Sequence, residues 1–226
     1  KTTPAVIEFV DIAGLVKGAS RGEGLGNKFL ANIRMTDAIV HVVRCFDDEN
    51  VIHVEGSTDP IRDMDTIDLE LVMSDMEMVD RRIDKAQKAA KGDKKFLHEA
   101  EVFQGLREWL DQGKSARGYL PQVPEDDAAL IATSELLSLK PVIYAANLDE
   151  DGFSDPEAVP YYRLVEERAA AQGAQVIPVC AKLEAEIAEL DAEEKKMFLD
   201  DLGVAESGLD RLVKASYTLL GLISYL

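Results

Sequence analysis

Cysteine and positive charge are both scarce in this sequence. Its 226 residues include two cysteines, Cys45 and Cys180, and their wide separation has none of the spacing of a metal site. Reduced thiols in a cytoplasmic protein are therefore expected. Lysine and arginine number 25 against 43 aspartate and glutamate residues, a formal net charge of −18. This acid excess excludes a general attraction to nucleic acid, so DNA binding is not expected and any RNA contact requires a local basic patch.

Long apolar runs and targeting segments are absent as well. No stretch approaches the length of a membrane span, and no signal peptide opens the sequence, so we expect no contact with a membrane. Apolar residues make up 46% and charged residues 30% of the chain, proportions from which a protein of this length builds a folded core. The sequence starts at Lys1 rather than at a methionine, which favours a part of a longer protein.

The most informative stretch runs from Asp11 to Arg34. It follows a short apolar run at residues 5–10, which predicts a buried strand, and it begins with a DxxG pattern formed by Asp11 and Gly14. Nucleoside triphosphatases use this arrangement to sense a γ-phosphate, because the Asp reaches the magnesium shell and the Gly supplies a backbone N–H. Aspartate and glycine also end many strands as ordinary turn residues, so on the pattern alone a solvated loop is favoured.

Further apolar runs predict an α/β fold with a mostly parallel sheet flanked by helices. Three runs have the composition of buried strands, and the segments between them have helical periodicity. The predicted strands span residues 38–46, which we expect to be covered on both faces, 141–146 and 175–179. The predicted helices span residues 27–33, 69–90, 96–110, 125–139, 159–172, 183–190, 192–202 and 207–222, with Ser207 as the N-cap of the last.

An antiparallel helical hairpin, or coiled coil, interrupts this α/β pattern. Apolar residues recur every three or four positions between Leu69 and Ala90 and again between Phe96 and Leu110, which predicts two helices that share one seam. Residues 91–95 break the pattern as a tight turn. We expect the hairpin to project from the core, because each helix has a single apolar stripe.

The tip of this hairpin is basic. Seven basic residues stand against two acidic ones between positions 81 and 95, a local charge of 7 − 2 = +5. A solvated helix face and a contact with ribosomal RNA explain such a run equally well. The basic residues are Arg81, Arg82, Lys85, Lys88, Lys91, Lys94 and Lys95.

Polar motifs follow three of the predicted strands. Their order along the chain is DxxG from Asp11, NxxE from Asn147 and Cys-Ala-Lys from Cys180. Ligands of open parallel sheets lie beyond the carboxyl ends of the strands, so one nucleotide can reach all three motifs. The second and third motifs are weak when taken singly, but their order and their strand context together are a much stronger signal.

These segments resemble a known family, the YchF-type Obg-like ATPases. The resemblance rests on DIAGLVKGASRGEGLGNKFLANIR (11–34), NLDEDGF (147–153), VCAKLEAEIAEL (179–190) and the inserted hairpin, and it covers essentially the whole chain. It implies a P-loop NTPase core of the G-domain type that binds ATP and Mg²⁺ in a cytoplasmic, ribosome-associated protein. The implied domains are a first part of the core at 1–64, the hairpin at 65–118, and a second part of the core with C-terminal helices at 119–226.

The resemblance also implies roles at the phosphate end of the nucleotide. Asp11 would orient a magnesium-bound water, and Gly14 would donate its N–H to the γ-phosphate. Leu15 stands where many GTPases have the Gln that positions the attacking water. Because a leucine side chain neither donates nor accepts a hydrogen bond, hydrolysis must rely on another group or be slow.

At the base end, the resemblance implies that Asn147 bonds the purine, while Leu148 and Glu150 replace the Lys and Asp of the usual NKxD motif. Glu150 is one methylene longer than Asp and cannot take the same two guanine hydrogen bonds, so the family is expected to prefer ATP over GTP. The segment that stands in place of Ser-Ala-Lys consists of Cys180, Ala181 and Lys182. We expect the Cys180 thiol to be inert, with the alternative that its modification blocks ATP.

Two parts of the family pattern do not occur in this sequence, namely the P-loop GxxxxGK[ST] and the C-terminal TGS domain. Because the P-loop supplies most of the grip on phosphate, we expect this chain alone to be inactive and the full-length protein to be an ATP hydrolase that acts as a molecular switch. One alternative is a non-catalytic ribosome- or protein-binding module built on the hairpin. Another is a GTPase of the Obg group, against which Leu148 and Glu150 argue.

Overall fold

The computed structural model describes residues 6–12, 25–51 and 56–222. The chain divides into two compact units. The sheet unit comprises residues 1–9, 38–64 and 141–226, and the hairpin unit comprises residues 10–37 and 65–140. Each unit has a hydrophobic core of its own. The three-part domain division expected from the sequence stays a prediction.

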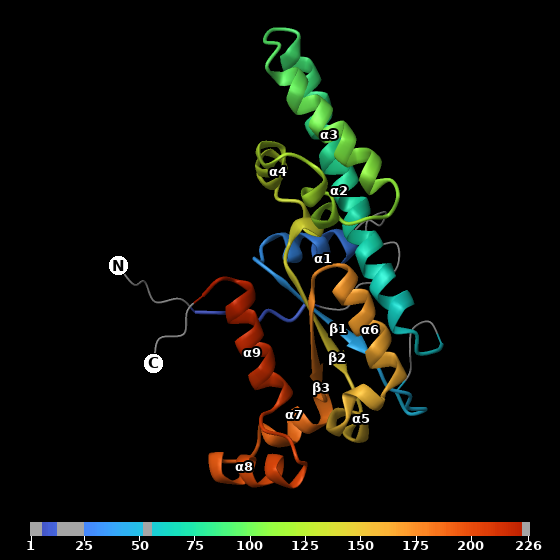
Figure 1. Ribbon diagram of the computed structural model, residues 1–226, viewed down its shortest axis with the longest axis vertical. Helices are drawn as coiled ribbons and strands as arrows, with labels where there is room; N and C mark the ends of the chain where they lie inside the picture. Colours follow the sequence, from blue (N-terminus) through green and yellow to red (C-terminus); the bar gives the residue numbers. More distant parts are fainter. Residues whose placement is uncertain (1–5, 13–24, 52–55, 223–226) are drawn as a thin grey trace. The chain divides into compact units, whose positions relative to one another are not determined.

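The sheet unit is built on three parallel strands (Figure 1). They are β1 (Ile39–Arg44), β2 (Val142–Asn147) and β3 (Gln175–Val179), adjacent in that order. The register pairs Arg44 with Asn147 and Asn147 with Val179, so the carboxyl ends of the three strands meet at one edge of the sheet. The predicted strands and their parallel arrangement are confirmed.

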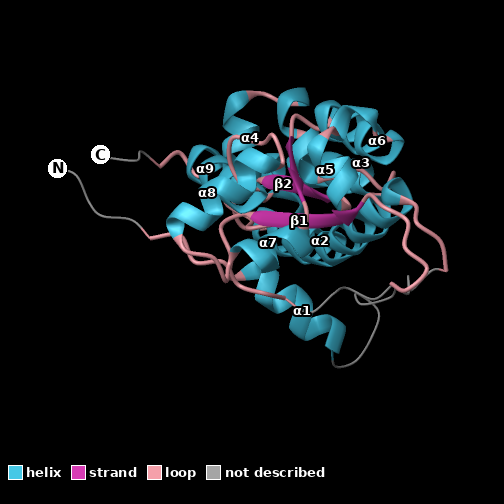
Figure 2. Cartoon of the chain, turned by 90° about the horizontal axis from the view of Figure 1, so that it is seen from below, coloured by secondary structure: helices cyan, strands magenta, loops and turns pink. Residues whose placement is uncertain are grey.

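Helices cover both faces of this sheet (Figure 2). On one face, Tyr144 of β2 packs into a core that includes α6 (Pro160–Ala171). On the other face, Ile143 packs into a core with Ala215 of α9 (Gly208–Leu219). Because successive residues of a strand point to opposite faces, a strand that is buried on both faces reads as a continuous apolar run, as β2 does.

Several short elements complete the sheet unit. They are α5 (Glu150–Ser154), the 3₁₀ turn η4 (Pro156–Ala158), α7 (Ala181–Ile187) and α8 (Ala192–Asp201). The predicted N-cap of α9 is confirmed, since the Ser207 hydroxyl accepts a hydrogen bond of 3.2 Å from the Asp210 N–H. The sequence analysis did not predict α5.

Two expectations about strands were wrong. Residues 6–12 have no regular secondary structure, and Val6, Phe9 and Val10 are 91%, 48% and 57% exposed. A strand needs a neighbouring strand for its hydrogen bonds, and β1 to β3 do not pair with this segment. The predicted cover on both faces of β1 is also incomplete: β1 lies at one edge of the described sheet, and its Val42 is 62% exposed.

The hairpin unit contains two long antiparallel helices (Figure 1). They are α2 (Pro60–Ala90), whose last 26 positions lie in this unit, and α3 (Phe96–Leu110), and the predicted turn at 91–95 joins them. Val79, Phe103 and Leu106 lie in the shared core at 1% exposure or less. The predicted hairpin is therefore confirmed, except that α2 begins at Pro60 and that Leu69, expected in the seam, is 47% exposed.

The helix predicted over residues 125–139 is shorter than expected. It ends at Ala132 as α4 (Glu125–Ala132), and a separate 3₁₀ turn, η3 (Leu137–Leu139), follows. Between them, Glu135 has a positive φ of 51°, which no α-helix allows. The chain turns here because the carboxylate of Asp75 on α2 accepts hydrogen bonds from the backbone N–H groups of residues 137 and 138, each at 2.7 Å.

The remaining elements of the hairpin unit are α1 (Leu25–Arg34) and the 3₁₀ turns η1 (Ala116–Gly118) and η2 (Leu120–Gln122). Helix α1 confirms the short helix predicted after the glycine-rich stretch. Within the described ranges, no helix is both long and apolar enough to cross a membrane.

Candidate functional site

Two of the polar motifs meet at the carboxyl edge of the sheet. Asn147 is the last residue of β2, and its side-chain oxygen accepts a hydrogen bond of 3.0 Å from the backbone N–H of Ala181. Ala181 is the first residue of α7, which follows β3 directly. The parallel register places these ends side by side, so the structure brings the NxxE and Cys-Ala-Lys motifs together as their strand context predicted.

A second contact joins the same two motifs. The Lys182 ammonium donates a hydrogen bond of 2.5 Å to a carboxylate oxygen of Glu150. Both side chains are open to solvent, at 46% exposure for Glu150 and 71% for Lys182. The hydrogen bond and the charge of Glu150 raise the pKa of Lys182 above its ordinary value, so the amine stays protonated at neutral pH. The site thus presents one carboxylate that already has a cation as partner.

Leu148 and Cys180 lie beneath this edge and not at its surface. Their exposures are 2% and 1%, and both belong to the core that packs against α6. The Leu148 N–H donates a hydrogen bond of 2.8 Å to the carbonyl of Val179. Burial raises the pKa of the Cys180 thiol, and a protonated, buried thiol reacts slowly. These two side chains lie in the core beneath the edge of the sheet, so a ligand at that edge cannot reach them.

Two positioning features were missed by the sequence analysis. Asp149 caps α5, because its side chain accepts a hydrogen bond of 2.8 Å from the Gly152 N–H. A side chain at Gly152 would meet Val159 Cγ2 at 2.9 Å, so the turn after β2 requires glycine there. The signal was present in the sequence, since Asp followed three residues later by Gly after a strand is a pattern of an N-cap and a tight turn.

Arg44 fixes the loop that follows β1 at the same edge of the sheet. Its guanidinium donates hydrogen bonds to three backbone carbonyls, those of Phe46 at 3.0 Å, Val51 at 2.8 Å and Asp48 at 3.2 Å. In the register, Arg44 lies beside Asn147. The loop next to the candidate site is therefore held in place by an arginine that the sequence analysis treated only as part of a strand.

The residues predicted for the phosphate end are described only in part. Asp11 is exposed and lies outside any helix or strand, and Gly14 and Leu15 fall outside the described residues. No group of three or more His, Cys, Asp or Glu side chains in the described ranges is arranged to hold a metal ion. The role of Asp11 toward magnesium therefore stays a prediction.

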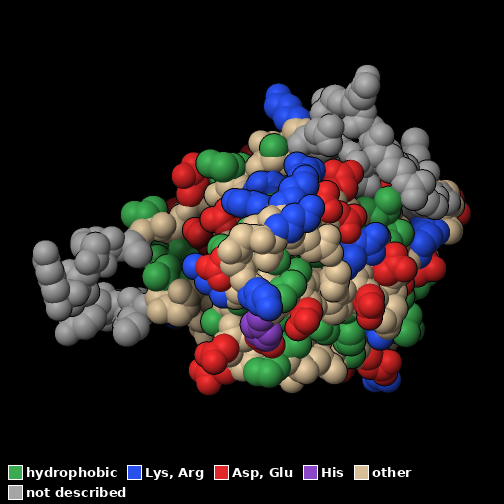
Figure 3. All heavy atoms as spheres, turned by 90° about the horizontal axis from the view of Figure 1, so that it is seen from above, with side chains coloured by type: hydrophobic (Ala, Val, Ile, Leu, Met, Phe, Trp, Pro, Cys, Tyr) green, Lys and Arg blue, Asp and Glu red, His purple; other side chains and the backbone are tan. Residues whose placement is uncertain are grey.

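The basic hairpin tip combines paired and unpaired cations. Ion pairs join Arg81 to Glu77 at 3.2 Å, Arg82 to Glu99 at 2.5 Å and Lys95 to Asp93 at 2.9 Å. Figure 3 shows Lys and Arg side chains gathered on the face that carries the tip. Four exposed lysines of the tip form no ion pair with other described residues: Lys85, Lys88, Lys91 and Lys94.

Comparison with known proteins finds relatives along the whole chain. The ribosome-binding ATPase YchF of Bacillus subtilis (strain 168) is 52% identical over 226 residues, which are 100% of this chain and 61% of that protein. The protein of the same name from Haemophilus influenzae is 50% identical over 223 residues, 98% of this chain and 60% of that protein. The chain is homologous to the YchF proteins. It spans about three fifths of the length of these relatives.

Two further comparisons agree with this homology. The solved structure of the Schizosaccharomyces pombe YchF GTPase superposes with a TM-score of 0.78 at 32% identity, over 92% of this chain and 57% of that one. The family model described as 50S ribosome-binding GTPase matches residues 1–91. The resemblance to the YchF family and the P-loop NTPase fold class are thereby confirmed. The names differ on the nucleotide, since the two curated YchF proteins are called ATPases and the solved one a GTPase.

Proposed function

We propose that this chain supplies the base-binding part of a YchF-type ATPase, which binds ATP with Mg²⁺ and hydrolyses it as a molecular switch. The observation that carries the proposal is the pair of contacts from Asn147 to Ala181 and from Glu150 to Lys182 at the carboxyl edge of the sheet. A nucleotide base binds at this edge in parallel α/β folds. In the same proposal, Asp11 orients the magnesium-bound water and Gly14 donates its N–H to the γ-phosphate.

The position of Glu150 supports a preference for ATP over GTP. A GTPase reads guanine with a short Asp carboxylate that accepts two hydrogen bonds from the base, and a base without these donors leaves that carboxylate unpaired. Here the carboxylate belongs to a longer side chain at the first position of α5, and it is already bonded to Lys182. An adenine base can therefore enter without leaving a carboxylate unpaired.

Competitive binding of ATP and GTP, with Mg²⁺ present, tests this proposal. The protein should be a chain extended to the full length of its relatives, so that the phosphate end is complete. We expect ATP to displace GTP, and the shorter side chain of Glu150→Asp to narrow the preference. Glu167→Asp on the exposed surface of α6 is the matched control and should change nothing. A preference of the unmodified protein for GTP would refute the argument from Glu150.

We also propose that the hairpin tip contacts ribosomal RNA in the cytoplasm. The predicted contact residues were all seven basic positions from 81 to 95, and those best placed for it are the four exposed lysines without an ion pair (Lys85, Lys88, Lys91 and Lys94). Each phosphate that they neutralise should add about 0.7–0.9 to the slope of log affinity against log salt. The chain as a whole carries −18, so this attraction is confined to the tip.

Co-sedimentation with ribosomes at several salt concentrations tests the RNA contact. We expect charge reversal at Lys88, Lys91 and Lys94 to weaken association and to flatten its salt dependence. Lys196→Glu, on the exposed surface of α8, adds the same kind of charge away from the tip and should leave association nearly unchanged. Equal sedimentation of the triple variant and the unmodified protein would refute a contact through these three lysines.

A non-catalytic binding module is the second candidate function. It is favoured by Leu15, which offers no hydrogen bond to an attacking water, and by a charged hairpin that is folded around a core of its own. Turnover by the full-length protein separates the two: ATP hydrolysis that Asn147→Ala slows supports the switch, and ribosome association without any hydrolysis supports the module.

A further inference from the structure

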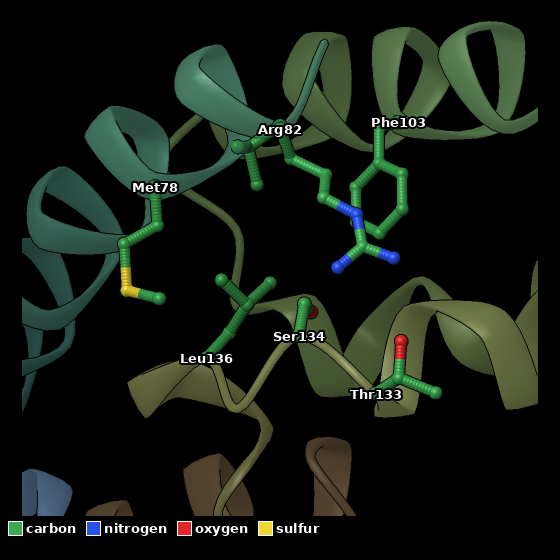
Figure 4. A pocket seen from close by; sticks show the side chains of 7 residues that line it. Met78, Arg82, Phe103, Thr133, Ser134 and Leu136 are labelled. Atoms are coloured by element: carbon green, nitrogen blue, oxygen red, sulfur yellow. The ribbon is translucent and has the colours of Figure 1, made fainter. Parts of the chain in front are cut away.

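The hollow between α2, α3 and the turn after α4 is closed to a ligand. Figure 4 shows Arg82 extending across it from α2 beside Phe103, and its guanidinium already donates a hydrogen bond of 2.5 Å to Glu99. Three of the side chains that line the hollow, Val79, Phe103 and Leu136, are each at most 1% exposed. A small molecule finds little open surface there, whereas the carboxyl edge of the sheet carries exposed polar side chains.

At that edge, the loop at residues 46–51 leaves the sheet beside Asn147. The register pairs Arg44 with Asn147, and the N–H of Cys45 donates a hydrogen bond of 2.8 Å to the Asn147 carbonyl. The pairing of β1 with β2 therefore continues to the residue directly before the loop. Because neighbouring strands are about 4.8 Å apart, a nucleoside whose base is bonded to Asn147 lies within reach of the loop.

The loop has a fixed shape, for which Arg44 is mainly responsible. The guanidinium donates hydrogen bonds to three backbone carbonyls of the loop, at 2.8, 3.0 and 3.2 Å. A second attachment comes from α6, where the Tyr161 hydroxyl donates a hydrogen bond of 3.1 Å to the Asp47 carboxylate. A planar guanidinium holds its N–H donors in fixed directions, whereas a lysine ammonium is a compact point of charge. A lysine side chain in place of Arg44 therefore cannot hold all three carbonyls.

The exposed side of the loop suits the nucleoside part of a nucleotide better than its phosphates. Asp47, Asp48 and Glu49 are all exposed, and such a run of carboxylates repels phosphate but accepts hydrogen bonds from hydroxyl and amine groups. Val51, which is 46% exposed, adds apolar surface. We propose that the nucleoside lies against this loop and that Arg44 is a positioning residue, which holds the loop ready for it. This role requires a nucleotide at the same edge and so rests on the proposed function.

Binding of ATP and of inorganic tripolyphosphate, each with Mg²⁺, tests the role of Arg44 in the protein extended to the full length of its relatives. We expect Arg44→Lys to weaken ATP binding about tenfold, as it does when the loop keeps its shape in about a tenth of the molecules, and to leave tripolyphosphate binding unchanged. In ATP hydrolysis, KM should rise by the same factor while kcat stays nearly constant. Arg107→Lys on α3, where the arginine pairs with Asp80 and Asp111, is the matched control and should change none of these values.

Two further measurements separate this role from a general effect on the fold. Free guanidinium ion should restore ATP binding to Arg44→Ala but not to Asn147→Ala, and Tyr161→Phe should weaken ATP binding by a smaller factor than Arg44→Lys does. Equal ATP affinity of Arg44→Lys and the unmodified protein, or an equal loss of ATP and tripolyphosphate binding, would overturn the proposal. Absence of ATP binding by the unmodified protein would instead refute the proposed function, on which the role of Arg44 depends.

Discussion

The hydrogen bonds of Asp75 make the strongest stability prediction that the structure allows. Asp75 is completely buried on α2, and its two carboxylate oxygens accept hydrogen bonds of 2.7 Å from the N–H groups of Leu137 and Ser138, one each. The substitution Asp75→Asn keeps the shape of the side chain but replaces one oxygen by an N–H₂ donor. One backbone N–H then loses its acceptor and faces a second donor.

The expected cost follows from the loss of one buried partner. A buried polar group without a partner costs about 1–3 kcal/mol. The equilibrium constant for local opening of the backbone at residues 137 and 138 should therefore rise by a factor of about 5–150. Hydrogen exchange at the amides of these two residues measures that factor directly. Asp80→Asn is the control, because Asp80 is 57% exposed and pairs with Arg107 at the surface, where an ion pair contributes less than about 1 kcal/mol.

The effect of Asp75→Asn should also depend on pH. Burial raises the pKa of Asp75 above its usual value, against the lowering effect of the hydrogen bonds from Ser138 and Leu137. The native state therefore holds this proton to a higher pH than the unfolded state, and the unmodified protein loses stability as pH rises through that window. The asparagine has no such proton, so the stability gap between the two proteins should narrow as pH rises. A gap that widens instead would show that the carboxylate is favoured in its charged form, and the reasoning from burial would fail.

Two other predictions concern packing and thiol chemistry in the sheet unit and the hairpin. Gly208→Ala would place a Cβ 2.9 Å from Val179 Cα, so we expect the free energy of unfolding, measured with denaturant, to fall by about 1–3 kcal/mol. Gly92→Ala is the control, because a Cβ there would lie 3.7 Å from its nearest neighbour, and it should leave the stability unchanged or raise it. Alkylation of Cys45 and Cys180 in the folded chain should be slow at pH 8 and should become fast only on unfolding. The reason is that burial raises the pKa of both thiols, that of Cys45 to about 12. Fast labelling of the folded chain would contradict this.

The parts of the fold that the sequence predicted are those in which a local pattern and the tertiary structure agree. The apolar run that became β2 is buried on both faces, and the three- and four-residue spacing in α2 and α3 faces a common core. The meeting of Asn147 with Ala181 was predictable for a related reason. Parallel strands end at a common edge, so residues that follow adjacent strands are neighbours even though 34 positions separate them.

The parts that could not be predicted depend on partners distant in the sequence. The end of α4 at Ala132 depends on a carboxylate 62 positions before Leu137, and nothing in residues 125–139 indicates it. The apolar pattern of residues 6–10 has the right composition for a strand, but composition does not supply the second strand that its hydrogen bonds require. Patterns therefore predict what a segment can form, and the available partner decides whether it forms.

At the candidate site, the burial of a residue says more about its role than its identity in the motif does. The comparison with the NKxD motif treats Leu148 and Glu150 alike, because each replaces one residue of the same base-binding motif. In the structure their environments are opposite, because Leu148 is 2% exposed within the core and Glu150 is 46% exposed at the edge. The exchange of Lys for Leu thus changes the floor of the site, and the exchange of Asp for Glu changes the surface that a base would meet.

In the proposed site, the two exchanges would not contribute equally to a choice between adenine and guanine. An ion pair as exposed as that of Glu150 and Lys182 is weak, so a guanine that offered two hydrogen bonds to the carboxylate would displace the lysine with little loss. The pair alone therefore does not account for a preference for ATP. In our proposal, a preference for ATP rests on where the longer Glu150 side chain places its carboxylate from the start of α5, a backbone position fixed by the Asp149 cap and by the glycine at 152. The proposal therefore makes base selectivity depend on the turn after β2 as much as on Glu150 itself.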